Sequence, residues 1–241
     1  MKLSNKFLPV LLLCTLTISV KSQQKTTMNT TLSPKQKNLI TISSYTAQGD
    51  LTKLKPALNE GLDAGVTLNE IRESLVHLYA YCGFPRSLRG LMTFMEVLKE
   101  REGKGIIDKV GAEASPITDK RDKYERGKEI LAELSGVKET GPKTGYAAFA
   151  PEIEVFLKEH LFADIFERDV LNYQERELVT ISVLSSIGGV EPMLSSHLGL
   201  CLNVGITPVQ LREFMSIIKT TVKKTDAASA EAVLTEVLAK Q

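Results

Sequence analysis

Apolar residues recur every three or four positions through most of this chain, and strict alternation of apolar and polar residues is nowhere sustained. The first spacing places apolar side chains on one face of an α-helix, whereas alternation is typical of a half-buried strand. The predicted fold class is therefore all-α. Helices are expected over the ranges 34–48, 51–64, 68–82, 88–99, 122–134, 151–166, 174–187, 191–204, 208–222 and 226–241.

The predicted helix 68–82 has the clearest signals at both of its ends. Thr67 and Glu70 form a T-x-x-E capping box, in which each side chain can satisfy a free backbone N–H at the start of the helix. Gly83 and Pro85 are expected to end it, because glycine favours the conformation that closes a helix and proline disfavours a helical residue before it. Its apolar face consists of Ile71, Leu75, Leu78 and Cys82.

A polar row on the same helix contains candidate site residues. Glu73 and His77 are four residues apart and therefore stack on one face, with Tyr81 one turn further along. A carboxylate, an imidazole and a phenol in one row could move protons. The same spacing also occurs on solvent-exposed helices, where such a pair contributes only about 0.2–0.5 kcal/mol. The helix alone leaves both interpretations open.

The chain contains an internal duplication. Residues 39–43 (LITIS) recur as residues 178–182 (LVTIS), and GVT at residues 65–67 recurs as GIT at residues 205–207. A single-residue insertion brings the two halves into register. Self-similarity over so long a unit predicts a duplicated domain rather than a solenoid of short repeats. The predicted organisation is a first repeat at 32–101, a linker at 102–121 and a second repeat at 122–241.

Residues 1–22 have the features of a signal peptide. Lys2 and Lys6 form a basic start, and the apolar run from 7 to 20 is shorter than the roughly 18–20 residues that a spanning helix needs. The mature protein is expected to begin near Gln23 and to be exported to the periplasm or the medium. It should have no membrane contact after cleavage. A retained anchor is the alternative.

The net charge of the chain and the motifs that it lacks limit the classes of function to be expected. The formal net charge is +1, so the sequence gives no indication of a nucleic-acid partner. It contains no C-x-x-C, no His/Cys cluster with zinc-site spacing and no glycine-rich phosphate loop, so we expect neither a metal nor a cofactor. Cys82 and Cys201 would remain after cleavage. Both lie on apolar helix faces, where a thiol is expected to react slowly.

Several motifs, taken together, resemble one known family. Residues 73–85 read E-x-x-x-H-L-x-x-Y-x-G-F-P, residues 176–181 read R-E-L-V-T-I, and residues 203–207 read N-V-G-I-T. They resemble the carboxymuconolactone decarboxylase superfamily, which includes the alkyl hydroperoxidase D-like proteins. The resemblance covers nearly all of the predicted mature chain in two copies. It implies a duplicated all-α domain and, because family members assemble as trimers or hexamers, a homotrimer of this chain.

Each repeat lacks polar residues that the other retains. The second repeat has Ile217 at the place of His77, and the first repeat has Ala57 at the place of His197. With the resemblance, this pattern implies one composite site in which His77 and His197 share a cavity. Drift in a non-catalytic scaffold would leave the same pattern. The proposed catalytic residues are Glu73, His77 and Tyr81 from the first repeat and Glu177 and His197 from the second.

The resemblance implies a cofactor-free lyase or isomerase acting on a small carboxylated lactone or a related acid. A histidine pair with Tyr81 could supply the proton donor and the contact to a developing oxyanion. One alternative is a peroxidase that works through Cys82, since the C-x-x-C positions of the peroxidase branch are here Val190 and Met193. The other is a binding scaffold without chemistry.

Overall fold

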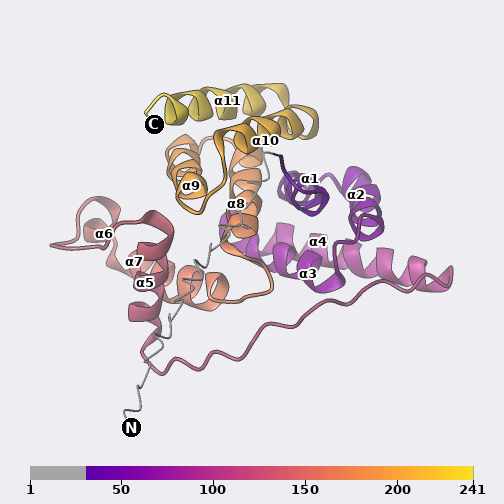
Figure 1. Ribbon diagram of the computed structural model, residues 1–241, viewed down its shortest axis with the longest axis horizontal. Helices are drawn as coiled ribbons and strands as arrows, with labels where there is room; N and C mark the ends of the chain where they lie inside the picture. Colours follow the sequence, from indigo (N-terminus) through magenta and orange to yellow (C-terminus); the bar gives the residue numbers. More distant parts are fainter. Residues whose placement is uncertain (1–30, 241) are drawn as a thin grey trace, which may run out of the picture.

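Helices make up all the regular structure of residues 31–240, the part of the chain that this computed structural model describes (Figure 1). The all-α fold class is therefore confirmed, while the predicted signal peptide lies outside the described residues. The helices before the linker are α1 (Pro34–Gln48), α2 (Leu51–Asp63), α3 (Leu68–His77) and α4 (Tyr79–Gly103). Those after it are α5 (Lys123–Ser135), α6 (Gly145–Phe149), α7 (Pro151–Phe156), the π-helix η1 (Leu157–Phe166), α8 (Tyr173–Ile187), α9 (Glu191–Asn203), α10 (Pro208–Thr221) and α11 (Lys224–Leu238).

Five helices of the duplicated unit, α1, α2, α8, α9 and α10, begin and end within one residue of their predicted bounds. Side-chain caps mark the starts of α1, α2, α8 and α10, and also that of α3. At the start of α3, the Thr67 backbone N–H donates to the Glu70 carboxylate over 2.8 Å, and the Glu70 N–H donates to the Thr67 hydroxyl over 3.3 Å. Thr207 and Gln210 make the same reciprocal pair at the start of α10.

The predicted helix 68–82 is interrupted, which corrects the expectation of one continuous helix. α3 ends at His77, the chain resumes as α4 at Tyr79, and Gly83 has a non-helical backbone with φ +79° and ψ 162°. A positive φ is accessible to glycine at little cost, so Gly83 produces a kink. Pro85 follows in the first turn of the resumed helix, where its missing N–H leaves no hydrogen bond unmade. The Gly-Phe-Pro segment therefore redirects the chain instead of ending the helix.

The predicted helix 151–166 is also different in the structure, because its second part is a π-helix. η1 packs closely on α5 at Gly127, where a Cβ atom would lie only 1.8 Å from the Lys158 carbonyl oxygen. Only glycine allows the two backbones to approach so closely. Phe166 and Arg168, at the end of η1 and just beyond it, reach the first repeat from here.

The centre of the molecule is α8, whose residues from Glu175 to Ser186 are all buried. It packs against α1 of the first repeat and against α9 and α11 of its own (Figure 1). Tyr81 packs against all three hydrophobic clusters of the core, one mainly in the first repeat, one mainly around α8–α11 and one between α5 and η1. The side chain of Tyr81 therefore lies where the two repeats and η1 meet.

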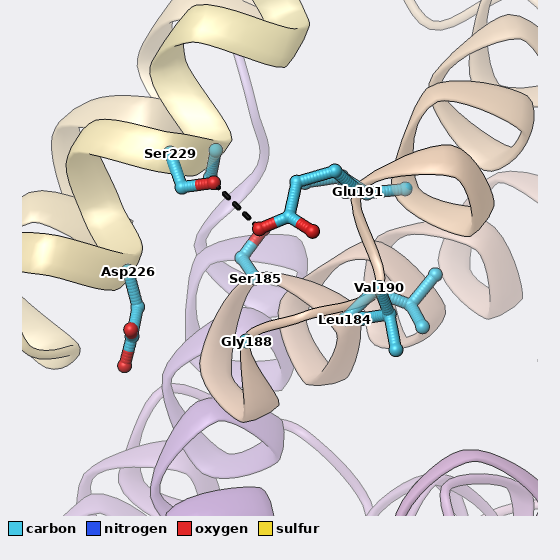
Figure 2. A pocket seen from close by; sticks show the side chains of 9 residues that line it. Leu184, Ser185, Gly188, Val190, Glu191, Asp226 and Ser229 are labelled. Carbon is cyan, nitrogen blue, oxygen red and sulfur yellow. Dashed lines mark hydrogen bonds between the residues drawn. The ribbon is translucent and has the colours of Figure 1, made fainter.

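A small space of about 10 Å³ lies between α8, α9 and α11. In Figure 2, Glu191 reaches across it and accepts a 2.8 Å hydrogen bond from the Ser229 hydroxyl of α11. Ser185, also on its wall, is buried without a hydrogen-bond partner among the described residues. The space is at the lower limit for a single water molecule, so its contacts serve to fix α11 onto the core.

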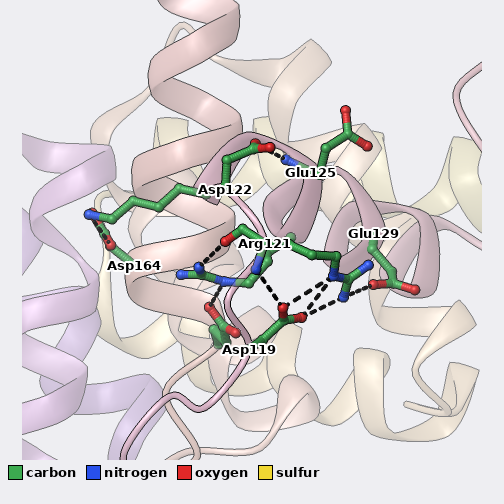
Figure 3. Close-up of polar contacts among 9 residues, drawn as sticks. Asp119, Arg121, Asp122, Glu125, Glu129 and Asp164 are labelled. Carbon is green, nitrogen blue, oxygen red and sulfur yellow. Dashed lines mark hydrogen bonds and ion pairs between the residues drawn. The ribbon is translucent and has the colours of Figure 1, made fainter.

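The linker after α4 is extended, and its first part is hydrogen-bonded to α3. The backbone N–H groups of Leu68 and Asn69 donate to the carbonyl oxygens of Lys109 and Val110, each over 2.9 Å. Groups at a helix start normally lack partners within the helix, so the linker caps α3 from outside. At its far end, Arg121 pairs with Asp119 and with Glu129 of α5, which joins the linker to the second repeat (Figure 3).

Large apolar side chains are exposed on two parts of the surface. On α4, the stripe that we call the α4 stripe is spaced three or four residues apart, and it consists of Phe84, Leu88, Met92 and Met95. On α6 and α7, exposed apolar side chains include Tyr146, Phe149, Ile153 and Phe156. Among residues 31–240, no helix combines the length and the apolar character needed to cross a membrane.

Candidate functional site

The polar row of α3 points into the protein instead of into solvent. Glu73 is 3% exposed and His77 has no exposed surface. Glu73 accepts hydrogen bonds from two arginines of the second repeat, from Arg176 over 2.7 Å and from Arg168 over 2.8 Å. Burial alone would raise the pKa of Glu73, but these two guanidinium groups lower it below its ordinary value. Glu73 is therefore an ionised carboxylate that joins the two repeats.

His77 is held by two side chains of α8. Its Nε2 atom lies 2.8 Å from the Thr180 hydroxyl, and its Nδ1 atom lies 3.2 Å from Nη1 of Arg176. The ring also meets the edge of Phe166, with the ring centres 5.1 Å apart. Burial, followed by the charges of Arg176 and His197, holds the pKa of His77 well below its usual value. His77 is consequently neutral at physiological pH.

A second carboxylate–histidine pair lies within the second repeat. His197 of α9 has its Nδ1 atom 2.8 Å from the Glu177 carboxylate of α8. Glu177 is fully buried, whereas the His197 side chain is 13% exposed. The other carboxylate oxygen of Glu177 is buried and has no hydrogen-bond partner among the described residues. His197 is therefore more accessible to a substrate than either carboxylate or His77.

Tyr81 separates the two histidines. Its ring centre lies 5.5 Å from that of His77 and 5.5 Å from that of His197. The hydroxyl is buried and makes no hydrogen bond within the described residues. Burial and the Glu177 carboxylate raise the pKa of Tyr81 above its ordinary value, against opposing effects of Thr180 and Arg176. The phenol is therefore protonated and is a hydrogen-bond donor.

The five residues predicted from the sequence lie in one connected cluster at the contact between the repeats. They come from α3, α4, α8 and α9. Contacts link Glu73, His77, Tyr81, His197 and Glu177 in this order, with a sixth residue, Arg176, between Glu73 and His77. The expected shared cavity is absent around His77, because that residue has no exposed surface. The histidines are connected through the Tyr81 ring instead.

Sequence reasoning missed three residues of this cluster: Arg168, Arg176 and Thr180. Arg176 is the largest of the fully buried side chains, and its Nε atom has no partner among the described residues. Arg176 and Thr180 are four residues apart and so lie on one face of α8. That spacing, within a helix otherwise rich in apolar residues, was the available signal for a polar face turned toward α3.

Known proteins with similar sequences show to which family this chain belongs. A family model described as "Carboxymuconolactone decarboxylase family" matches residues 22–93 and 151–236, which together exceed half of the chain. The chain belongs to the carboxymuconolactone decarboxylase family. A relative described as 4-carboxymuconolactone decarboxylase, from Acinetobacter baylyi (strain ATCC 33305 / BD413 / ADP1), is 30% identical over 94 residues, 39% of this chain and 69% of the relative. The two matched segments agree with a duplicated helical domain.

The cysteines of this carboxymuconolactone decarboxylase family member are poorly suited to thiol chemistry. Burial raises the pKa of Cys82 to about 12, and its thiol donates to the Leu78 carbonyl oxygen over 3.2 Å. Cys201 is fully buried, and burial raises its pKa well above the usual value. Both cysteines are free thiols. A thiolate is the reactive form, and both environments disfavour it.

Proposed function

We propose that this carboxymuconolactone decarboxylase family member is a cofactor-free lyase or isomerase that acts on a small carboxylated lactone or a related acid. The observation that carries the proposal is the Glu177–His197 pair, 2.8 Å apart, packed against the protonated phenol of Tyr81 from the other repeat. The activity named for the Acinetobacter baylyi relative supports the same reaction class.

In this proposal His197 is the general acid and base. Its Nδ1 atom donates to Glu177, which leaves Nε2 as the ring nitrogen available to a substrate. In a decarboxylation the bond to the carboxylate carbon breaks, carbon dioxide leaves, and the electron pair remains on the substrate as an enolate. Tyr81 would donate a hydrogen bond to the enolate oxygen, and protonated His197 would deliver the proton to carbon.

His77 and Glu73 have a supporting role in this assignment. His77 is neutral and fully buried, and both of its ring nitrogens are already held, by Thr180 and Arg176, so we assign it no contact with a substrate. Glu73 is fully engaged by Arg168 and Arg176. These residues fix the position of α3 against α8 and thereby the start of α4, which carries Tyr81.

The first test is turnover of a panel of small lactones that bear a carboxylate. We expect carbon dioxide release with at least one of them, or a rearranged product detected by proton NMR if the reaction is an isomerisation. Tyr81→Phe should lower the rate, because it removes the oxyanion donor and keeps the packing ring; loss of one such donor costs about 10²–10³-fold in kcat. A folded protein that converts no member of the panel would favour the non-catalytic scaffold.

We also propose that the chain forms a homotrimer, with the α4 stripe in the interface. Its four apolar residues are each at least half exposed, and a row of this kind on a helix is typical of a protein–protein contact. Multi-angle light scattering at micromolar concentration should give three times the chain mass. Met95→Lys should weaken the assembly, whereas Arg89→Lys, on the same helix, should leave it intact. A monomeric wild-type protein would contradict the proposal.

A further inference from the structure

Arg176 is a buried arginine with no role yet assigned to it. We propose that Arg176 is a positioning residue that holds His77 as the neutral tautomer with its proton on Nε2, and so directs a hydrogen-bond chain from His77 through Thr180 towards Tyr81. The importance of this chain for turnover rests on the function proposed above. The tautomer of His77 does not depend on that function and can be measured separately.

The contacts of the guanidinium group define which nitrogen of His77 carries the proton. Nη2 of Arg176 donates to the Glu73 carboxylate over 2.7 Å and to the Arg168 carbonyl oxygen over 2.6 Å. These bonds fix the group so that Nη1 lies 3.2 Å from Nδ1 of His77. Arginine has only donors and no acceptor, so Nδ1 must accept and carries no proton. The single proton of the neutral ring is therefore on Nε2.

Thr180 accepts a hydrogen bond from this Nε2–H group. Its Oγ1 atom lies 2.8 Å from Nε2 of His77, and with His77 as donor the Thr180 oxygen is the acceptor. Arg176 and Thr180 are one turn apart on α8, so this one helix holds both nitrogens of the ring. The hydrogen of the Thr180 hydroxyl is then free to donate to another acceptor.

The charges around His77 disfavour a second proton on the ring. Two positively charged side chains, Arg168 and Arg176, contact one carboxylate, Glu73, so this group of three carries a net positive charge. A protonated ring would direct its Nδ1–H at the guanidinium of Arg176. The charged and titratable groups facing His77 are Glu73 on α3, Tyr81 on α4, Arg168 after η1, Arg176 on α8 and His197 on α9.

We assign Tyr81 as the acceptor of the hydrogen of Thr180. The Thr180 hydroxyl and the Tyr81 ring both lie against His77, the first 2.8 Å from Nε2 and the second with its ring centre 5.5 Å from that of His77, and the buried Tyr81 hydroxyl has no hydrogen-bond partner among the described residues. When Thr180 donates to the phenol oxygen, the phenol hydrogen is left to donate onward. In this proposal its acceptor is a substrate oxygen or the carboxylate oxygen of Glu177 that has no partner among the described residues. Arg176 would thus act on Tyr81 through two intervening side chains.

Nitrogen-15 NMR of the three histidine rings tests the first link. In the wild-type protein, His77 should show a protonated Nε2 and an unprotonated Nδ1 throughout the range of about pH 5.5–8 in which histidines usually titrate. Arg176→Met should allow His77 to take up a proton, with its pKa raised by about one unit or more. A wild-type His77 with the proton on Nδ1, or one that titrates normally, would overturn the proposal.

Arg168→Gln is the matched control for Arg176→Met. It also removes an arginine from Glu73, but Arg168 makes no hydrogen bond to His77. We expect the His77 tautomer to be unchanged in this variant. If both variants alter His77 equally, the carboxylate rather than Arg176 controls the tautomer, and the proposal is wrong. The signals of His160 and His197 report whether each variant is folded.

A pair of Thr180 variants tests the second link and does not depend on the stability of the arginine variants. Thr180→Val keeps the shape of the side chain and removes the hydroxyl, whereas Thr180→Ser keeps the hydroxyl. The carbon-13 shift of the Tyr81 phenol carbon should change in Thr180→Val and be restored in Thr180→Ser. An unchanged Tyr81 shift in Thr180→Val would refute the chain to Tyr81. Neither result depends on turnover, so failure of the proposed enzyme activity would be recognised separately.

Discussion

Replacing Glu73 by alanine should lower the free energy of unfolding by about 3–5 kcal/mol, because it leaves a buried charge without its partner. Arg176 has no exposed surface, and the other side chain that it contacts by hydrogen bond, His77, is neutral. Urea denaturation at pH 7 measures the loss. The lowered pKa of Glu73 means that the wild-type stabilisation is complete above the ordinary carboxylate pKa of about 4.3 and is lost as the pH falls below that range.

Glu100→Ala is the control for this experiment. Glu100 also pairs with a basic residue, Lys55, but the side chains are 50% and 39% exposed, respectively. Solvent screens such a pair, and we expect little change in stability. Equal losses for Glu73→Ala and Glu100→Ala would show that the buried contact between the repeats is not a major source of stability.

Replacing His197 by alanine should lower kcat by about 10²–10⁴-fold on any substrate found, the range that general acid–base catalysis supplies. His197 makes one hydrogen bond, to the fully buried Glu177, whose other oxygen has no partner among the described residues, so the variant should lose stability as well as activity. Steady-state kinetics together with thermal unfolding separate these two effects. The corresponding His77→Ala variant is less informative, because His77 is fully buried and loses two contacts.

His160→Ala is the matched control for the His197 variant. His160 also pairs with an acid, Asp164, with its Nδ1 atom 3.1 Å from the carboxylate, but it lies exposed on η1, outside the cluster. Its replacement should leave kcat unchanged. An unchanged kcat in His197→Ala as well would exclude His197 as the general acid and would require a different catalytic group.

The parts of the fold that depend on residues close together in the sequence could be predicted from it. Capping boxes at Thr67 and Thr207 depend on side chains three residues away, and the repeated motifs defined the paired helices. The kink at Gly83 was harder to predict, because the same residues can end a helix or redirect it. The π-helix η1 was not predicted, since it packs on α5 at Gly127, thirty residues earlier in the chain.

In the candidate site, too, some features could be predicted from the sequence and others could not. The reciprocal loss of histidines between the repeats predicted that His77 and His197 belong to one cluster, and the structure places Tyr81 between them. Arg176 was missed because its burial depends on Glu73, 103 residues away in the sequence. A single sequence does not show which arginine on a helix will find such a partner, and arginines are rarely fully buried.

Because the linker joins the two repeats covalently, the first repeat pairs with the second within each individual chain. Only the first repeat supplies Glu73 and His77, and only the second supplies Arg176 and His197. Two separate polypeptides could also associate like with like, and such pairs would oppose two acids or two arginines across the contact. A covalent tether gives the correct partner a high effective concentration. One gene product therefore ensures equal numbers of the two halves and one complete cluster in every folded molecule.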